Sequence, residues 1–186
     1  VKSNMMTHLS DTIVNNDDLP MVEAGAPAYL LMIDSLISED PDSKEMLSTA
    51  AQLYTAYADV FVTDEQRSRK MAAKALTYAN QAMCIANDDA CGLKKMSFED
   101  FQAVIASMDA GDLPYLFALG NAWASWIMAN TNDFNALADI SRIEAIMLKI
   151  TQVDESYKDG AAFLYLGTLA TFLPPALGGK PEEGKR

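Results

Sequence analysis

The chain has 186 residues, half of them apolar, and a formal net charge of −12. This length and apolar content predict a single domain with a sizeable core, while the excess of acidic side chains repels phosphate backbones and argues against nucleic acid as a partner. Ala and Leu dominate and long β-branched runs are missing, so helix is favoured nearly throughout.

Polar breaks divide the amino-terminal third into three predicted helices. A short helix is expected within residues 1–15, and the run NNDD before Pro20 then interrupts the chain. A second helix is predicted from about residue 21 or 27 to residue 38. The turn at residues 40–43 ends it, because Asp caps helices and Pro fits the first helical turn. Residues 44–62 then keep strict helical spacing and predict the third helix.

A capping box is predicted at the start of the fourth helix, which is expected to extend to residue 86. Thr63 is followed three residues later by Gln66, the spacing at which two side chains cap each other's backbone. Small residues line the inner face of this helix and permit close approach of a neighbour. The outer face is basic and carries Arg67, Lys70 and Lys74. We interpret this face either as a docking patch for a partner or as a solvated helix surface.

Two cysteines, Cys84 and Cys91, are the only ones in the chain and stand seven positions apart. In an oxidising compartment they can pair into a short disulfide staple. Their spacing differs from that of a CxxC redox or zinc motif, and His8 is the only histidine, so no metal site is expected. The segment 87–96 is the least regular part of the chain, and a short helix is predicted from Ser97 to about residue 110.

The stretch from Asp112 to Asn130 is the centre of the predicted fold. It reads DLPYLFALGNAWASWIMAN and is uncharged after its first residue. A helix that is apolar on both sides must be covered on both sides, with Asp112 as a candidate N-cap and Gly120 allowing close backbone approach. A membrane span is the competing interpretation, but spanning needs about 20 predominantly apolar residues, and polar and small residues dilute this run.

The carboxyl-terminal part predicts a helix over residues 134–153 and a last helix that extends to about Phe172 and is stopped by Pro174. Helix pairs joined by short turns, without any predicted strand, describe an all-α solenoid or bundle of tetratricopeptide-like hairpins. The spacing of the turns gives no strict 34-residue period, so such repeats are degenerate. We expect one helical domain over residues 1–186, with an amino-terminal segment at 1–18 and a frayed or truncated tail at 174–186.

Three stretches together resemble the TRAP transporter T-component (TatT) family. They are AAQLYTAYADVFV at residues 50–62, LPYLFALGNAWASWI at residues 113–127, and SRIEAIMLKITQVDESYKDGAAFLYLGTLATFLPPALGG at residues 141–179. Their order and spacing match the pattern of that family over roughly residues 20–182. No single motif is specific, and the resemblance depends on the ordered set.

The resemblance implies a periplasmic, tetratricopeptide-like lipoprotein anchored through a lipidated amino-terminal cysteine. Such proteins are thought to bind the periplasmic solute-binding protein of a TRAP transporter and to assemble as homotrimers with apolar channels. This sequence has no amino-terminal Cys and no signal peptide, so we expect a mature or trimmed chain, lipid-anchored only as its full-length precursor. The cysteine pair is not a feature of the family pattern.

The favoured function is therefore a non-enzymatic scaffold that binds the solute receptor and a small apolar or carboxylate ligand, without a cofactor. Its candidate ligand-binding residues are the aromatic side chains Tyr54, Tyr57, Phe61, Tyr115, Trp123 and Trp126. Such a set either fills a core or walls a cavity. The alternatives are a generic tetratricopeptide-like adaptor with a polar peptide groove and, third, an enzyme, for which no catalytic motif appears.

Overall fold

The structure, a computed structural model, describes residues 8–13 and 15–172, and every regular element in these ranges is helical. Residues 8–13 are helical as well. The elements that follow are α2 (Leu19–Glu39), α3 (Lys44–Phe61), α4 (Glu65–Ala86), η1 (Asp88–Ala90), η2 (Leu93–Lys95), α5 (Phe98–Ser107), α6 (Leu113–Ala129), α7 (Phe134–Ala138), α8 (Ile140–Val153), η3 (Tyr157–Gly160) and α9 (Ala161–Phe172). The all-α fold class predicted from the sequence is confirmed.

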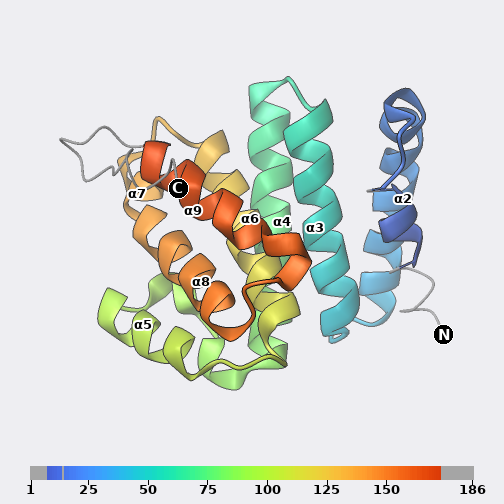
Figure 1. Cartoon of the computed structure of the whole chain (residues 1–186). Coiled ribbons are helices and arrows are strands. Elements are labelled where there is room, and N and C mark those ends of the chain that lie inside the picture. The colour runs from blue at the N-terminus through green and yellow to red at the C-terminus, as the bar shows by residue number, and fades with distance from the viewer. Residues whose placement is uncertain (1–7, 14, 173–186) are drawn as a thin grey trace.

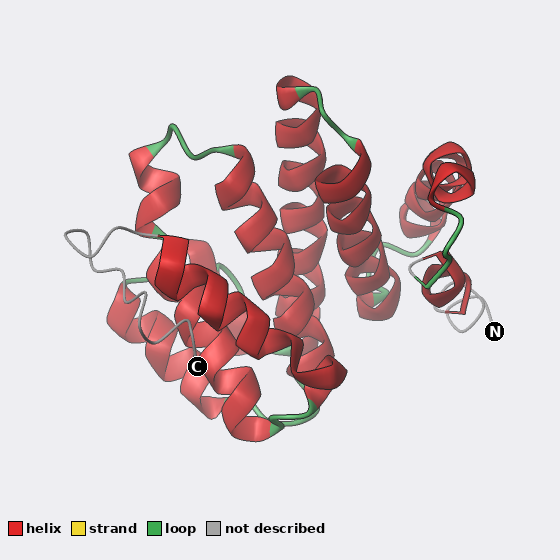
Figure 2. Cartoon of the chain, turned by 45° about the horizontal axis from the view of Figure 1, so that its top comes forward, coloured by secondary structure: helices red, strands yellow, loops and turns green. Residues whose placement is uncertain are grey.

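Helices α3, α4 and α6 pack against one another and form the centre of the molecule (Figure 1). On one side α6 contacts α8, which in turn contacts α9 and α5. On the other side α2 packs mainly on α3. Figures 1 and 2 both place α2 at an edge, on the side of α3 that is turned away from α8 and α9. The predicted domain extent reaches into residues 1–7 and 173–186, which lie outside the described residues.

Helix α6 is buried on both faces, as its sequence predicts. Eleven of its residues are buried, among them Tyr115 on one face and Phe117 on the other. Gly120 lies so close to α8 that a Cβ atom built there would be 2.7 Å from Met147 Cε and 2.9 Å from Ile146 Cγ2. The predicted close approach at this glycine is therefore real, and it explains why α6 and α8 pack tightly.

Within the described part of the chain, α2 and not α6 is the helix long and apolar enough to cross a membrane. Only 28% of its 18-residue apolar window is buried inside the molecule. Length and composition alone do not separate a spanning helix from a packed one. The membrane-span interpretation considered for α6 is replaced by a packed core helix, because α3, α4 and α8 cover it.

Two helix boundaries differ from the sequence prediction. The N-cap of α4 is Asp64 and not Thr63, and its Oδ1 accepts a hydrogen bond from Arg67 N at 2.7 Å. An Asp carboxylate is at least as good a cap as a Thr hydroxyl. The single helix predicted over residues 134–153 is divided at Asp139, whose carboxylate accepts a hydrogen bond from Trp123 Nε1 and pairs with Arg142.

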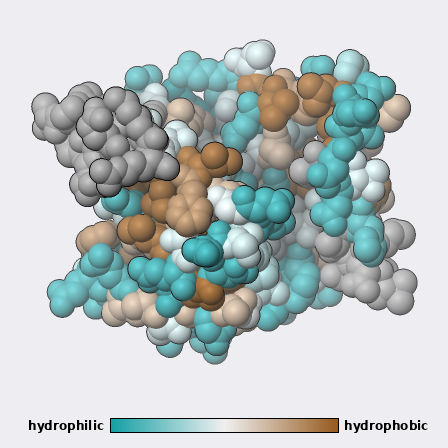
Figure 3. Space-filling view, in the orientation of Figure 1, coloured by the Kyte–Doolittle hydropathy of each residue, from teal (hydrophilic) through white to brown (hydrophobic). Residues whose placement is uncertain are grey.

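An apolar surface lies on the side formed by α8 and α9 (Figure 3). Leu164 is 75% exposed and Phe163 53% exposed on α9, while the exposed Leu148 of α8 lies toward α5. Helix α9 carries no charged residue between Ala161 and Phe172. Because it is apolar on all sides and packs on α8, its outer face remains in solvent and is a candidate contact surface.

The contact at Gly120 predicts a large difference between two Gly→Ala substitutions. Gly120→Ala is expected to lower the free energy of unfolding by about 1–3 kcal/mol, because Ile146 is β-branched and cannot move away easily. Gly25→Ala in α2 has open space around the added methyl and should raise it by about 0.5–1 kcal/mol. Urea denaturation of both variants measures the difference, and equal changes would contradict the packing described here.

Candidate functional site

An apolar pocket of about 190 Å³ lies between α3 and a wall formed by Ile13, Asn16 and residues of α2. Its walls are Ile13, Asn16, Leu19, Val22, Ala26, Tyr29 and Leu30 on one side and Leu53, Ala56, Tyr57, Val60 and Phe61 on the other. We call it the α2–α3 pocket. Asn16 and the two tyrosines supply its polar side-chain atoms. Two of the predicted aromatic residues, Tyr57 and Phe61, lie in its lining.

The spacing of residues along α3 produces one wall of this pocket. Its five α3 residues recur at intervals of three and four positions, so they form a single stripe along the helix. Tyr57 and Phe61 pack along this stripe with ring centroids 5.4 Å apart and ring planes tilted by 40°. Ala56 on α3 and Ala26 on α2 both line the pocket, and their short side chains leave room between the two helices.

Polar contacts of tyrosines define the edges of the pocket. Tyr57 donates a hydrogen bond to the backbone oxygen of Glu23 at 3.4 Å, which joins α3 to α2. The guanidinium of Arg67, at the start of α4, lies 5.8 Å from the centre of the Tyr57 ring. Burial raises the pKa of Tyr29 to about 12. The pocket therefore combines an uncharged interior with one cation close to its aromatic wall.

A second, smaller cavity of about 90 Å³ lies between α6, α8 and α9. Its lining is Ala124, Ile127, Met128, Ile140, Ile143, Tyr165, Thr168 and Leu169. Next to it, Ser125 donates a hydrogen bond to Asp59 at 2.5 Å and Tyr165 donates one to Asn121. Burial and the nearby charge of Asp59 raise the pKa of Tyr165 to about 12. This arrangement ties α9 to α6 and α3, and none of the predicted site residues lies in it.

The six predicted aromatic residues do not converge on one site. Tyr57 and Phe61 line the α2–α3 pocket. Tyr54, although on the same helix, turns to a polar cluster with Asp34 on α2. Tyr115 donates a hydrogen bond to Glu45 at 3.1 Å on the far end of α3.

The two tryptophans also separate. Trp123 is fully buried, meets the Phe101 ring edge-on at 6.2 Å, and donates its Nε1–H to Asp139 at 3.2 Å. Trp126 lies under Lys94, whose Nζ is 3.4 Å from the ring centre. Because neither residue lines a pocket described above, the structure places them in core packing and at a loop contact.

The predicted basic patch also divides among different contacts. Arg67 covers Tyr57, as described, and Lys70 is exposed. Lys74 is turned to α2, where it forms an ion pair with Asp34 and donates a hydrogen bond to Tyr54 at 3.0 Å. Of the three, Arg67 and Lys70 remain available at the surface of α4.

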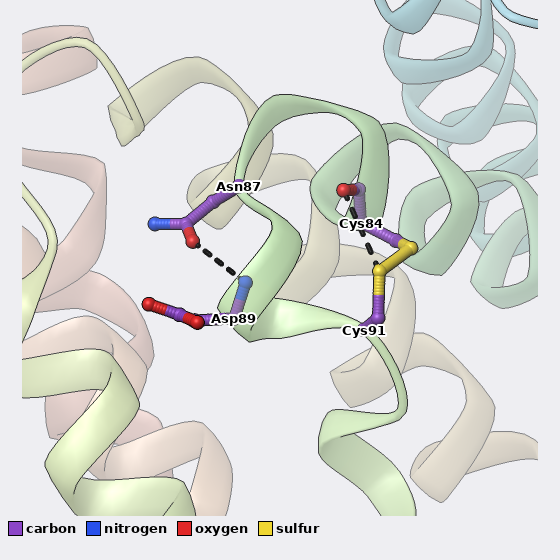
Figure 4. The surroundings of a disulfide bond; sticks show 4 residues. All are labelled: Cys84, Asn87, Asp89 and Cys91. Carbon is purple, nitrogen blue, oxygen red and sulfur yellow. Dashed lines mark hydrogen bonds between the residues drawn. A yellow bond between two sulfur atoms is a disulfide. The ribbon is translucent and has the colours of Figure 1, made fainter.

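Cys84 and Cys91 form a disulfide that links the last turn of α4 to the loop after η1 (Figure 4). Their Cα atoms are 4.4 Å apart. In the same loop Asn87 Oδ1 accepts a hydrogen bond from the backbone nitrogen of Asp89 at 3.1 Å. This disulfide constrains the irregular segment after α4. Lys94 belongs to that segment and contacts the ring of Trp126. Among the described residues there is no cluster of three side chains suited to hold a metal ion.

Sequence reasoning missed the α2 side of the pocket. Ala26, Tyr29 and Leu30 lie on one face of a helix whose existence was predicted but whose buried face was not assigned. The available signal was their helical spacing together with Ile33 and Ile37, which recurs every three or four positions. Only the fold shows that this face meets α3.

Comparison with known proteins gives one family. The family described as TRAP transporter T-component matches residues 15–186. The match therefore includes the α2–α3 pocket, apart from Ile13, and all of the central helices. No curated protein matches the chain.

Buried tyrosines predict an alkaline transition. Burial raises the pKa of Tyr29, Tyr115 and Tyr165 to about 12, against about 10 in an unfolded chain. As pH rises, the unfolded state loses these protons first. The stability that the three protonated tyrosines contribute is therefore present below about pH 10 and is lost as pH rises to about 12.

Absorbance at 295 nm, followed with circular dichroism, measures tyrosine ionisation and unfolding together. Most of the signal should titrate near pH 12 in native protein and near pH 10 in guanidinium chloride. Titration near 10 with the helices intact would contradict the burial described.

Proposed function

The chain belongs to the TRAP transporter T-component family, and from this membership we propose that it is a non-enzymatic periplasmic component that binds the transporter's solute-receptor protein and a small ligand. The transporter association follows from the family. The observation that carries the ligand proposal is the α2–α3 pocket, an apolar hollow within the matched residues. By family resemblance we further propose a homotrimer and a lipid anchor on the full-length precursor.

The chemistry of the pocket supports a short apolar molecule with a carboxylate. Its interior offers aliphatic and aromatic surface, which favours a hydrocarbon tail. Arg67, beside the Tyr57 ring, is the cation available to an acidic head group. A peptide groove would need several exposed amide or basic side chains along its wall, and this lining has Asn16 and two tyrosine hydroxyls. The small-ligand scaffold is therefore favoured over a peptide adaptor.

The outer face of α9 supports the partner-binding part of the proposal. Leu164 and Phe163 are exposed there, at adjacent positions of an uncharged helix. Exposed apolar side chains that gather on one face mark contact sites more often than scattered ones do. We propose this face as the contact for the solute receptor.

Filling the pocket is expected to abolish ligand binding without unfolding the protein. Hexanoate and hexan-1-ol serve as probes, and isothermal titration calorimetry measures both. Ala56→Leu should weaken both probes at least about tenfold, because it occupies the hollow. Arg67→Gln should weaken hexanoate alone, by a few fold, since an exposed cation contributes modestly.

Ala103→Leu, at an exposed position of α5, is the matched control and should bind as wild type does. Absence of hexanoate binding to the wild-type chain, or equal binding by Ala56→Leu, counts against the pocket as a ligand site.

Receptor binding is tested by pull-down with the cognate solute-receptor protein over a range of salt concentrations. Wild type should recover the receptor, and Leu164→Asp should lower recovery because it places a charge in an apolar contact. Phe134→Asp is the matched control, since Phe134 is also exposed, at 87%, but lies on α7. Recovery of nothing at any salt concentration opposes the partner proposal, and equal losses for both variants oppose the α9 surface.

A further inference from the structure

A single carboxylate of α2 is held by three donors from the two neighbouring helices. Asp34 Oδ2 accepts a hydrogen bond from Tyr54 on α3 at 2.7 Å, and Asp34 Oδ1 accepts one from Tyr78 on α4 at 2.8 Å. Lys74 on α4 completes the set with an ion pair to Oδ2. We call these four residues the Asp34 cluster. The side chains of Tyr54, Tyr78 and Lys74 all point to the carboxylate of Asp34, and their contacts join α2 to both α3 and α4.

Beside this cluster, α2 is attached through an apolar face that includes Tyr29, Leu30 and Ile33 and through the hydrogen bond from Tyr57 to the backbone oxygen of Glu23. Its buried face meets α3, but the α2–α3 pocket lies between them, so part of this contact is a hollow and not packed side chains. Its opposite face is in solvent, where Leu31 is 70%, Met21 60% and Met32 40% exposed. Figures 1 and 2 show α2 as the outermost long helix on its side of the molecule. Polar contacts therefore add to an apolar contact that the pocket leaves incomplete.

The Asp34 cluster is suited to supply that attachment. Hydrogen bonds that end on a charged acceptor are about twice as strong as neutral ones. Lys74 is partly exposed, and solvent screens its ion pair; the two phenol hydrogen bonds add direction and hold the carboxylate in place. Burial alone would raise the pKa of Asp34, but the hydrogen bonds from Lys74, Tyr54 and Tyr78 outweigh it and keep this pKa below its ordinary value.

The pocket and the cluster lie one helical turn apart on the same helices. Leu30 lines the pocket and Asp34 follows it by four positions on α2, while Leu53 and Tyr57 flank Tyr54 on α3. Motion of α2 away from α3 must therefore break the Asp34 cluster and open the pocket together. We propose that α2 is a movable wall of the α2–α3 pocket and that Asp34 is the latch that closes it onto α3 and α4.

This latch regulates the ligand site of the proposed function and rests on it for its biological purpose, but the motion itself is measurable without ligand. A latch with a lowered pKa stabilises the docked helix above the ordinary pKa of Asp and loses this effect as pH falls through the folded value. At neutral pH the latch is closed. Release then requires either a pH below the ordinary pKa of an Asp side chain or competition for the three donors.

Hydrogen–deuterium exchange of the full chain, without ligand, tests the latch. Asp34→Asn should speed exchange in α2 at least about tenfold, because the ion pair and the charged acceptor are lost, while α4, α6 and α8 keep their wild-type protection. Glu23→Gln removes the same charge from an exposed position of α2 and should leave exchange unchanged. Unchanged α2 exchange in Asp34→Asn, or an equal increase in all helices, overturns the proposal.

A second pair of variants covers the other side of the contact. Tyr78→Phe removes one donor on α4 and should speed exchange in α2 in the same direction by a smaller factor, whereas Tyr157→Phe in η3 should not. If Tyr78→Phe leaves α2 exchange at the wild-type value, the cluster does not hold the helix.

Ligand kinetics separate this inference from the proposed function. In stopped-flow experiments hexanoate should associate several fold faster with Asp34→Asn than with Glu23→Gln, since the wall opens more often. Faster α2 exchange without any hexanoate binding supports the latch and opposes the ligand site. The opposite outcome is that hexanoate binds Asp34→Asn and Glu23→Gln at equal rates and that hydrogen exchange in α2 is the same in both. This outcome supports the ligand site and overturns the latch.

Discussion

Burial of α6 is the constraint on which the rest of the structure depends. Between Leu113 and Ala129 this helix has no charged side chain and is apolar on every side, so exposure of either face to water would be costly. Helices α3, α4 and α8 cover it, and Gly120 lets α8 approach closely enough for Ile146 and Met147 to fill the contact. The outer helices α2, α5 and α9 pack around this centre, and each keeps a face in solvent.

Several cations of this acidic chain join neighbouring helices. Arg69 donates to the backbone oxygen of Ala129 at the end of α6, and Lys149 donates to that of Ala106 near the end of α5. Arg142 donates to Leu93 and Met96 in the disulfide-linked loop. Carbonyls at helix ends lack partners within the helix and carry partial negative charge, so a cation from a neighbouring helix satisfies both needs. For this reason a row of basic residues on one helix, such as that on α4, is a poor guide to a docking surface.

Helical periodicity in the sequence predicted which segments form helices and that α6 is central, because both follow from the pattern of one segment alone. It did not predict which helix faces meet. Trp123 and Trp126 stand three positions apart, yet Trp123 packs against Phe101 of α5 and Trp126 under Lys94 of the loop. Tyr54 and Tyr57 diverge in the same way, one to Asp34 and one to the pocket. The candidate site was half predicted, through Tyr57 and Phe61, since its other wall depends on where α2 comes to lie.

Helix α2 is long and apolar, and it also contains the carboxylate of Asp34. This carboxylate favours one placement of the helix over another. By length and composition it could cross a membrane, but Asp34 lies well inside it, and an ionised carboxylate in hydrocarbon is strongly disfavoured without partners. Tyr54, Tyr78 and Lys74 supply those partners within the protein. The carboxylate therefore favours the docked position of α2. A fully apolar residue at position 34 would remove this preference and leave α2 attached through a contact that encloses a hollow. Asp34 therefore adds a polar attachment to the apolar contact of α2 with α3, and in the proposed latch it is the group that controls this attachment.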